Sequence, residues 1–321
     1  MARSAASQKW LSFRWSSELE SAMSAGGGKL PQLCDATEVC AKCGAMAAKS
    51  KCSRCLKVCY CCKRCQEKHW PIHKKTCKTP AQQEAVAGQQ EDRNERLFDA
   101  SFDGDLATVR AMIAEGADVN WAQPETRDTP LQVASQRGHL SVVNALIAAR
   151  AVVDRVNAIG YTALMFSVQE GHEAIVSALH RVAGASVHHV NNKGRSALHY
   201  AAQQGHIGIV RYLLRAGAHP NVVSTEGDGE TPLNLASGQG HPAVVQALIE
   251  AGVNVDHANI VGASPLGLAA QNGQIEIVRA LLAANADPRI AAHNGSTAIS
   301  LAKRNNHPAI IALLEARLAE V

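Results

Sequence analysis

The chain has 321 residues, for which two domains are the usual expectation. Its 46% hydrophobic and 19% charged residues, with a net charge of +4, are ordinary globular usage. No apolar run approaches the roughly 18–20 residues that span a bilayer, which excludes a membrane protein. Aromatic residues make up only 4% while alanine is abundant, which favours stacked helices with small residues between them.

The first segment, residues 1–33, is rich in serine and alanine and is expected to be mostly disordered. Gly28-Lys29 does not form a phosphate loop, because Leu30 stands where a Ser or Thr would hold magnesium. An organelle transit peptide remains an alternative, although Glu18 and Glu20 come early. No secretory signal is recognised, so we expect an intracellular protein of the cytoplasm, the nucleus or both.

All ten cysteines lie between Cys34 and Cys77. Together with one histidine they form four half-sites: Cys40 with Cys43, Cys52 with Cys55, Cys61 with Cys65, and His73 with Cys77. Eight ligands suffice for two closed tetrahedral zinc sites. A segment this short needs such a staple, because it cannot bury enough apolar surface to fold alone. A disulfide framework and a redox Cys-x-x-Cys fit less well, since neither a secretory signal nor a βαβ pattern is present.

The end of this segment carries Cys65, Gln66, Trp70, His73 and Cys77, and with this ending the chain resembles the MYND zinc finger. The resemblance implies a finger over residues 34–80 that binds two Zn²⁺ ions with interleaved ligands. One set would be Cys40, Cys43, Cys61 and Cys65, and the other Cys52, Cys55, His73 and Cys77. Cys59 replaces an aromatic residue of the family and Cys62 follows the fifth ligand, so either could stand in for Cys61.

The same resemblance implies a groove for short proline-containing peptides, formed here by Ser53, Gln66 and Trp70. Gln66 and Trp70 are four residues apart, so one helical face would present an amide beside an indole. An extended proline-rich strand loses little entropy on docking against such a face. Alternatively, Trp70 only covers the metal sites.

The finger is basic, with nine lysines and two arginines against Glu67 between Cys40 and Lys78. Part of this excess balances the zinc thiolates, and Tyr60 and Trp70 alone offer no aromatic ladder for bases. Nucleic acid is therefore not the expected partner. A chromatin- or nucleic-acid-associated transcriptional regulator is the alternative function.

A connector over residues 81–92 is expected to be a partly helical linker, because it lacks a repeating apolar face. Beyond it the sequence repeats every 33 to 35 residues, which is the ankyrin period. The segment from Ser196 to His206, continued to Ala218, resembles the ankyrin consensus nearly throughout. The resemblance implies a mostly α fold, a solenoid of about seven repeats over residues 93–321. The approximate repeats are 93–126, 127–158, 159–192, 193–227, 228–260, 261–293 and 294–321.

The repeats share the same residue types at the positions that begin, pack and end the first helix. Thr or Ser caps the first helix, a small residue follows five places later, and Gly ends the helix in the left-handed conformation. Arg150 and Asn285 stand where other repeats have such a Gly and are expected weak points. The first and last repeats look like capping repeats with polar outer faces.

One histidine recurs per repeat, and the spacing is too wide for a shared metal. We expect hydrogen bonds in the turn between the two helices. These residues are His139, His172, His206, His241 and His307. The adjacent pair His188 and His189 has no third ligand in view.

An ankyrin array implies a protein partner on the concave face of hairpin tips and first helices. The expected tips are 122–128, 158–161, 192–195, 226–230, 259–262 and 293–296. The acidic tip at Glu226 to Glu230 and the basic residues Lys193 and Arg195 suggest a charged groove. No room remains for a SET domain, both zinc sites are closed, and no catalytic motif is present. We therefore expect a monomeric, non-enzymatic adaptor with two binding modules and unknown partners.

Overall fold

The computed structural model describes residues 50–51, 59–60, 80–225 and 228–320. The predicted disordered segment, all eight predicted zinc ligands and the three predicted groove residues lie outside this part. The chain divides into two compact units, Met1–Gln89 and Gln90–Val321. In the first unit, β1 (Ser50–Lys51) pairs antiparallel with β2 (Cys59–Tyr60), Ser50 opposite Tyr60. This short ribbon was not predicted from the sequence.

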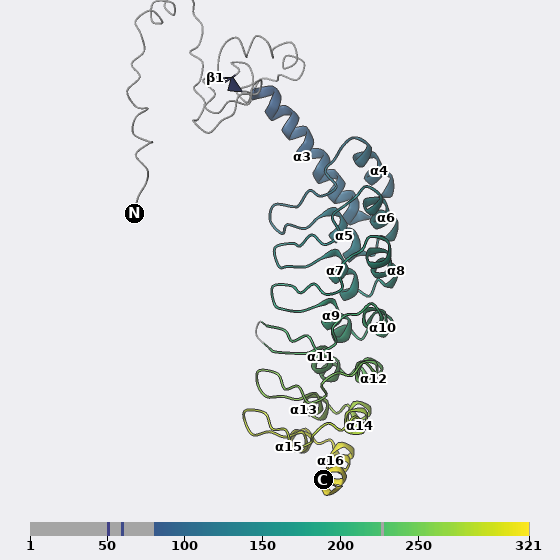
Figure 1. Cartoon of the computed structure of the whole chain (residues 1–321), viewed down its shortest axis with the longest axis vertical. Helices are drawn as coiled ribbons and strands as arrows, with labels where there is room; N and C mark the ends of the chain where they lie inside the picture. Colours follow the sequence, from purple (N-terminus) through teal and green to yellow (C-terminus); the bar gives the residue numbers. More distant parts are fainter. Residues whose placement is uncertain (1–49, 52–58, 61–79, 226–227, 321) are drawn as a thin grey trace, which may run out of the picture. The chain divides into compact units, whose positions relative to one another are not determined.

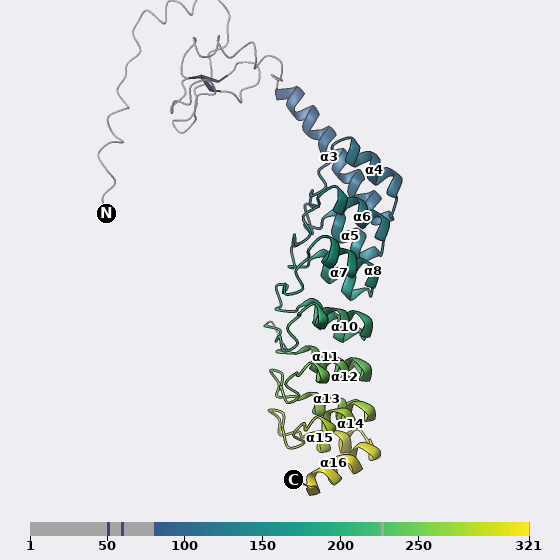
Figure 2. The ribbon, with the colours of Figure 1, turned by 45° about the vertical axis from the view of Figure 1, so that its right-hand side comes forward.

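The described residues from Pro80 onward form a stack of seven helix pairs, as the repeat period predicts (Figure 1), and the first helix begins ahead of the second unit. The first helices are α3 (Pro80–Asp103), α5 (Pro130–Arg137), α7 (Ala163–Gln169), α9 (Ala197–Gln204), α11 (Pro232–Gln239), α13 (Pro265–Gln271) and α15 (Ala298–Arg304). The second helices are α4 (Leu106–Ala114), α6 (Leu140–Ala148), α8 (Glu173–Ser177), α10 (Ile207–Arg215), α12 (Pro242–Glu250), α14 (Ile275–Ala283) and α16 (Pro308–Glu320). Figures 1 and 2 show each set as one column, with the hairpins as a third column beside the first helices. Helix α3 runs without interruption through the residues expected to form a linker.

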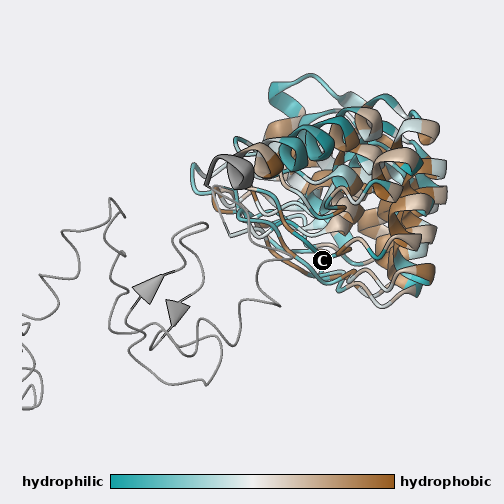
Figure 3. Cartoon of the chain, turned by 90° about the horizontal axis from the view of Figure 1, so that it is seen from above, coloured by the Kyte–Doolittle hydropathy of each residue, from teal (hydrophilic) through white to brown (hydrophobic). Residues whose placement is uncertain are grey.

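The core lies between the two columns of helices. It is built from the apolar pairs of the second helices, such as Val142 with Val143, and from the small residues of the first helices. Those small residues, Ala134, Ser167, Ala201, Ala236, Ala269 and Ala302, are all 0% exposed. Seen along the stack, the hydrophobic residues gather on the helices (Figure 3). The close packing predicted at these positions is confirmed.

The predicted helix caps are also present. Thr129, Thr162 and Thr231 accept a hydrogen bond from the backbone three residues on, at 3.2–3.3 Å. The residue that donates this bond often reaches the next repeat as well. The side chain of Gln132, for example, donates to the carbonyls of Arg155 and Tyr161, both at 2.8 Å. Capping and stacking are therefore coupled through one side chain.

The turn between the two helices joins each repeat to the one before it. Gly205 has φ +74, and the ring of His241 from the next repeat packs against it. The ring's Nε2–H donates to the carbonyl of Gln203 at 3.0 Å. The equivalent bonds of His139, His172, His206 and His307 measure 3.0–3.2 Å. The predicted turn hydrogen bonds are confirmed, and their acceptors lie in the preceding repeat.

In the first repeat Asp105 takes the place of this histidine. Its carboxylate caps α4 by accepting from the backbone of Ala107 and Thr108, at 3.0 and 3.1 Å. A hydrogen bond from the Thr108 hydroxyl, followed by these backbone bonds, holds the pKa of Asp105 below its usual value. The left-handed turn that follows the second helix forms even where glycine is absent, because Arg150 and Asn285 adopt φ of 63° and 64°. Both predicted weak points thus adopt the strained conformation.

Gly205→Ala is expected to destabilise the array strongly. A Cβ there would lie 2.5 Å from Nδ1 of His241, in addition to the cost of the left-handed backbone. Gly217→Ala is the matched control, because its φ is +87 but nothing lies within 4 Å of its Cβ. We expect Gly205→Ala to lose about 1–3 kcal/mol more in the free energy of unfolding, measured by urea denaturation. Equal losses would mean that the ring packing contributes nothing.

The third repeat has one residue more in its second helix than the other internal repeats. Twelve positions separate His172 from Gly184, against eleven from His206 to Gly217. The extra residue is taken up by a π-helical turn, η1 (Ala178–Val182), directly after α8. Beside it the hydroxyl of Tyr212 and Nδ1 of His180 are hydrogen-bonded at 2.9 Å. The sequence analysis did not identify this irregularity, although the repeat spacing contains it.

Candidate protein-binding surface of the repeat array

The hairpin tips form an ordered column, because each is hydrogen-bonded to its neighbour through the backbone. The amide of Ala158 donates to the carbonyl of Thr126 at 2.9 Å, and that of Ile260 to Asp228 at 3.0 Å. Equivalent bonds link Asn192 to Ile159, Thr225 to Lys193, and His293 to Val261, at 2.9–3.3 Å. The predicted tips are therefore fixed relative to one another, apart from residues 226–227, which lie outside the described part.

Large apolar side chains stand exposed at two of these tips. Ile159 is 55% exposed, and Ile260 and Val261 are each 57% exposed. Adjacent exposed aliphatic side chains on a rigid turn are typical of protein-binding sites. The sequence analysis noted the charges of the tips and missed these residues.

A hollow of about 300 Å³ opens on the face made by hairpins and first helices. It is lined by Arg195, Asp228, Glu230, Asn234, Leu235, Gly238, Gln239, Leu268 and Asn272. Its floor comes from α11 and α13, and its charged rim from the preceding two hairpins. Gly238 creates the space, because four other repeats carry glutamine there: Gln136, Gln169, Gln203 and Gln271. A comparison of the repeats position by position would have revealed it.

The charges of the rim are arranged as a pair and a single carboxylate. Arg195 forms an ion pair with Asp228, which also accepts from the hydroxyl of Ser224. Burial acts to raise the pKa of Asp228, but the hydrogen bonds from Ser224 and Arg195 outweigh it and lower that pKa. Arg195 donates as well to Oε1 of Gln203 at 3.3 Å. The predicted charged groove thus contains a pre-formed ion pair.

Glu230 has a different environment. Burial is the main cause that raises its pKa, and the nearby charge of Asp228 adds to this. Asn259 from the next hairpin donates to its Oε1 at 2.8 Å and acts in the opposite direction, as do the charges of Arg195 and His257. The net result is a half-buried carboxylate whose ionised form is incompletely stabilised.

Behind the rim lies a fully buried histidine, His199, with 0% exposure. Its Nδ1 accepts from the amide of Ser196 at 3.0 Å, and its Nε2 donates to the carbonyl of Glu230 at 3.2 Å. The ring therefore carries its proton on Nε2. Burial lowers its pKa to about 4, so it is neutral at physiological pH.

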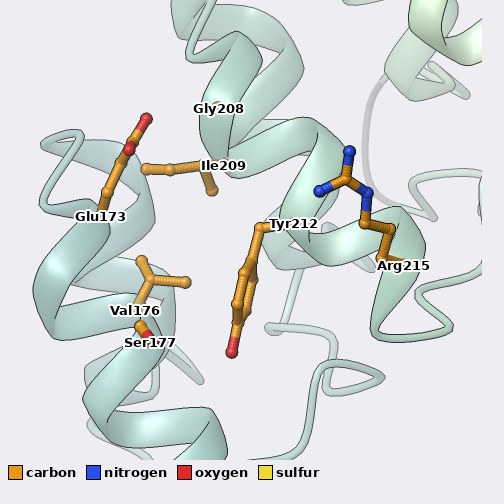
Figure 4. Close-up of a pocket in the computed structure, with 7 residues that line it drawn as sticks. All are labelled: Glu173, Val176, Ser177, Gly208, Ile209, Tyr212 and Arg215. Carbon is orange, nitrogen blue, oxygen red and sulfur yellow. The ribbon is translucent and has the colours of Figure 1, made fainter.

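A second hollow, of about 240 Å³, lies between α8 and α10 on the side of the second helices (Figure 4). Val176 and Ile209 line it, Tyr212 stands along one side, and Glu173 and Arg215 lie at its edges. The side chain of Glu173 covers Gly208, because a Cβ added at Gly208 would lie 1.9 Å from Oε1 of Glu173. None of the residues that line this hollow comes from a hairpin tip, and the hairpin side is the better candidate.

Comparison with known proteins agrees with this architecture. A family model described as ankyrin repeats (3 copies) matches residues 97–188, 156–224 and 221–292, more than half of the chain. The model of the MYND finger matches residues 40–77. The chain belongs to the ankyrin-repeat family and carries a MYND finger ahead of its repeats. The MYND finger followed by ankyrin repeats that the sequence predicts is confirmed.

Two similar proteins illustrate the relationship. The crystal structure of the human ASB11 ankyrin repeat domain matches with a TM-score of 0.61 and 26% identity, covering 68% of this ankyrin-repeat chain and 96% of that one. A probable E3 ubiquitin-protein ligase of Oryza sativa subsp. japonica, XBOS32, is 34% identical over 86 residues. That match spans 26% of this chain and only 17% of the relative.

The MYND finger is a zinc-binding module, and the donor set predicted for it in this chain suits zinc. Seven thiols and one imidazole, all outside the described residues, are the soft and borderline ligands that Zn²⁺ prefers. Within the described part of the chain, no group of His, Cys, Asp or Glu could hold a metal ion. No described helix is both long and apolar enough to cross a bilayer. Ankyrin repeats and MYND fingers are both interaction modules.

Proposed function

We propose that the protein is a non-enzymatic, intracellular adaptor in which two modules each bind another protein. The observation that carries this proposal is the hollow around Gly238 beside the exposed tip of Ile260 and Val261. A rigid surface that combines an apolar tip with a charged hollow supplies both burial and orientation to a partner.

For the finger, the proposal assigns two zinc ions to the ligand sets given above and a proline-containing peptide to Ser53, Gln66 and Trp70. Four protein ligands on each ion leave no open position, so zinc would support folding without providing a reactive water. This is the basis for proposing an adaptor rather than an enzyme.

The test is to capture partners with intact protein and compare variants by quantitative mass spectrometry. Ile260→Ser with Val261→Ser is expected to reduce recovery of one set of proteins about tenfold, because an exposed apolar anchor is lost. Gln66→Ala with Trp70→Ala is expected to remove a second set. Val182→Ser is the control, since this side chain is 73% exposed on the second-helix side. If all variants capture the same proteins, neither proposed surface is the recognising one.

The alternative, nucleic-acid binding by the basic finger, is distinguished by salt. Binding driven by phosphate contacts falls steeply as salt increases, whereas docking of a peptide against Trp70 is nearly indifferent to moderate salt.

A further inference from the structure

The hollow on the hairpin side contains an incomplete version of an interaction found in the repeat before it. Arg195 and Glu230 occupy the same position in successive repeats, directly before the residue that caps the first helix. Arg195 meets the side chain of Gln203, eight residues further on. Eight residues after Glu230 stands Gly238, which has no side chain to offer. The carboxylate therefore borders empty space on that side.

The charges around the hollow do not cancel. Arg195 is paired with Asp228, whose other oxygen accepts from Ser224. This leaves Glu230 as the single net charge among the lining residues. Among the described side chains, the one that donates a hydrogen bond to the Glu230 carboxylate is the neutral amide of Asn259. A half-buried carboxylate with one neutral donor is a strong attractor for a cation.

We propose that this hollow binds a lysine or arginine side chain of the protein partner, with Glu230 as its counter-ion. The inference rests on the proposed function, because it specifies the chemistry of the partner on that face. Leu235 and Leu268 offer an apolar floor for the aliphatic part of such a side chain. The tip at Ile260 and Val261, hydrogen-bonded to Asp228, would contact an apolar neighbour in the partner.

An anionic side chain fits this site poorly. It would face both Asp228 and Glu230, and Arg195 already serves Asp228 and Gln203. Of the three N–H groups of Arg195 that these two bonds leave over, the Nε–H is buried and cannot be reached from the hollow. His199 is neutral and directs its Nε2–H to the carbonyl of Glu230. The imidazole of His257 is bonded to the carbonyl of Gly229 at 3.1 Å.

Gly238→Gln is the variant that isolates the hollow. A Cβ at Gly238 meets nothing within 4 Å, and glutamine favours a helix more than glycine does. The variant should therefore fold with an unfolding midpoint at or above that of the wild type while filling the space. A library of random peptides displayed on phage is selected on the intact protein, and binders that also recognise Gly238→Gln are discarded.

The retained peptides are expected to share a lysine or arginine at one fixed position. In a synthetic peptide from this set, replacing the shared lysine by norleucine, or the shared arginine by glutamine, should weaken binding about tenfold. Glu230→Gln in the protein should weaken binding of the unchanged peptide by a similar factor. The two changes together should cost little more than either alone. Binding should also weaken as the pH falls and Glu230 takes up a proton. Glu276→Gln, an exposed carboxylate of α14, is the control and should leave affinity unchanged.

The outcomes separate the two proposals. Peptides that lose binding to Gly238→Gln but share no cation would overturn the inference and leave the protein-binding face in place. A selection in which every binder still recognises Gly238→Gln, and also the variant with serine at Ile260 and Val261, would overturn both. Additive losses from the peptide change and Glu230→Gln would show that the cation binds elsewhere.

Discussion

Removal of zinc from the intact protein is expected to unfold residues 40–77 and to leave the ankyrin array folded. Structural zinc contributes on the order of 10–16 kcal/mol in finger-sized peptides, more than such a segment gains from its own core. The array needs no metal, because its core is a continuous layer of buried aliphatic side chains. Elemental analysis should find two zinc ions per chain, both lost to a strong chelator.

Trypsin provides the structural readout, since the finger contains many lysines. After chelation we expect rapid cleavage within residues 40–77, while a fragment that contains the repeats resists digestion and keeps its helical circular dichroism. A finger that stays resistant without metal would refute this. A third ion, or only one, would refute the ligand assignment.

Single substitutions at the crowded cysteines resolve the remaining alternative. Cys61→Ser should lower the zinc content, whereas Cys59→Ser and Cys62→Ser should retain two ions per chain. If Cys59→Ser or Cys62→Ser loses zinc instead, that residue is the ligand in place of Cys61.

Mild acid is expected to destabilise the array through His199. The pKa of this buried ring is lowered to about 4, whereas an unfolded histidine titrates near 6.5. Between these values the unfolded chain binds a proton that the folded protein does not, so stability falls as the pH decreases from about 6.5 to about 4. A shift of this size corresponds to roughly 3 kcal/mol in the free energy of unfolding.

His199→Gln is the matched control, because Gln132 occupies the same position in an earlier repeat and makes equivalent bonds. Its Oε1 accepts from the amide of Thr129 at 2.8 Å, as Nδ1 of His199 accepts from Ser196. Urea unfolding at a series of pH values should show a steeper acid loss in the wild type by about 3 kcal/mol. Parallel curves for the two proteins would mean that His199 is protonated in the folded state.

The repeating parts of this fold could be predicted because each depends on a few neighbouring residues. Thr129 caps its helix through its own side chain, and Gly205 adopts a left-handed turn because it lacks one. Ala201 allows a neighbouring helix to approach because its side chain is small. The turn histidines were also placed correctly, but their acceptors in the preceding repeat depend on stacking geometry that no single repeat contains.

The parts that escaped prediction are departures from the repeat. Gly238 was not singled out from the sequence, because its importance appears only beside the glutamine that other repeats carry at this position. The ion pair between Arg195 and Asp228 could not be predicted, because it depends on the distance between two neighbouring hairpins. The extra residue between His172 and Gly184 is visible in the repeat spacing, but its accommodation as a π-helical turn at Ala178–Val182 is not. The zinc ligands and the groove at Gln66 and Trp70 remain predictions.

The turn histidines give the array a chemical polarity. Each ring donates backward, and Asp105 at the start satisfies its own helix and needs no predecessor. Of the histidine bonds, loss of the last repeat would break the one that leaves a carbonyl of Gln271, which water can hydrate. Loss of the first repeat would leave the Nε2–H of His139 to bond to water instead of the carbonyl of Phe102. The two ends of the array therefore differ in kind: shortening from the carboxyl end exposes a hydrogen-bond acceptor, and shortening from the amino end exposes a donor.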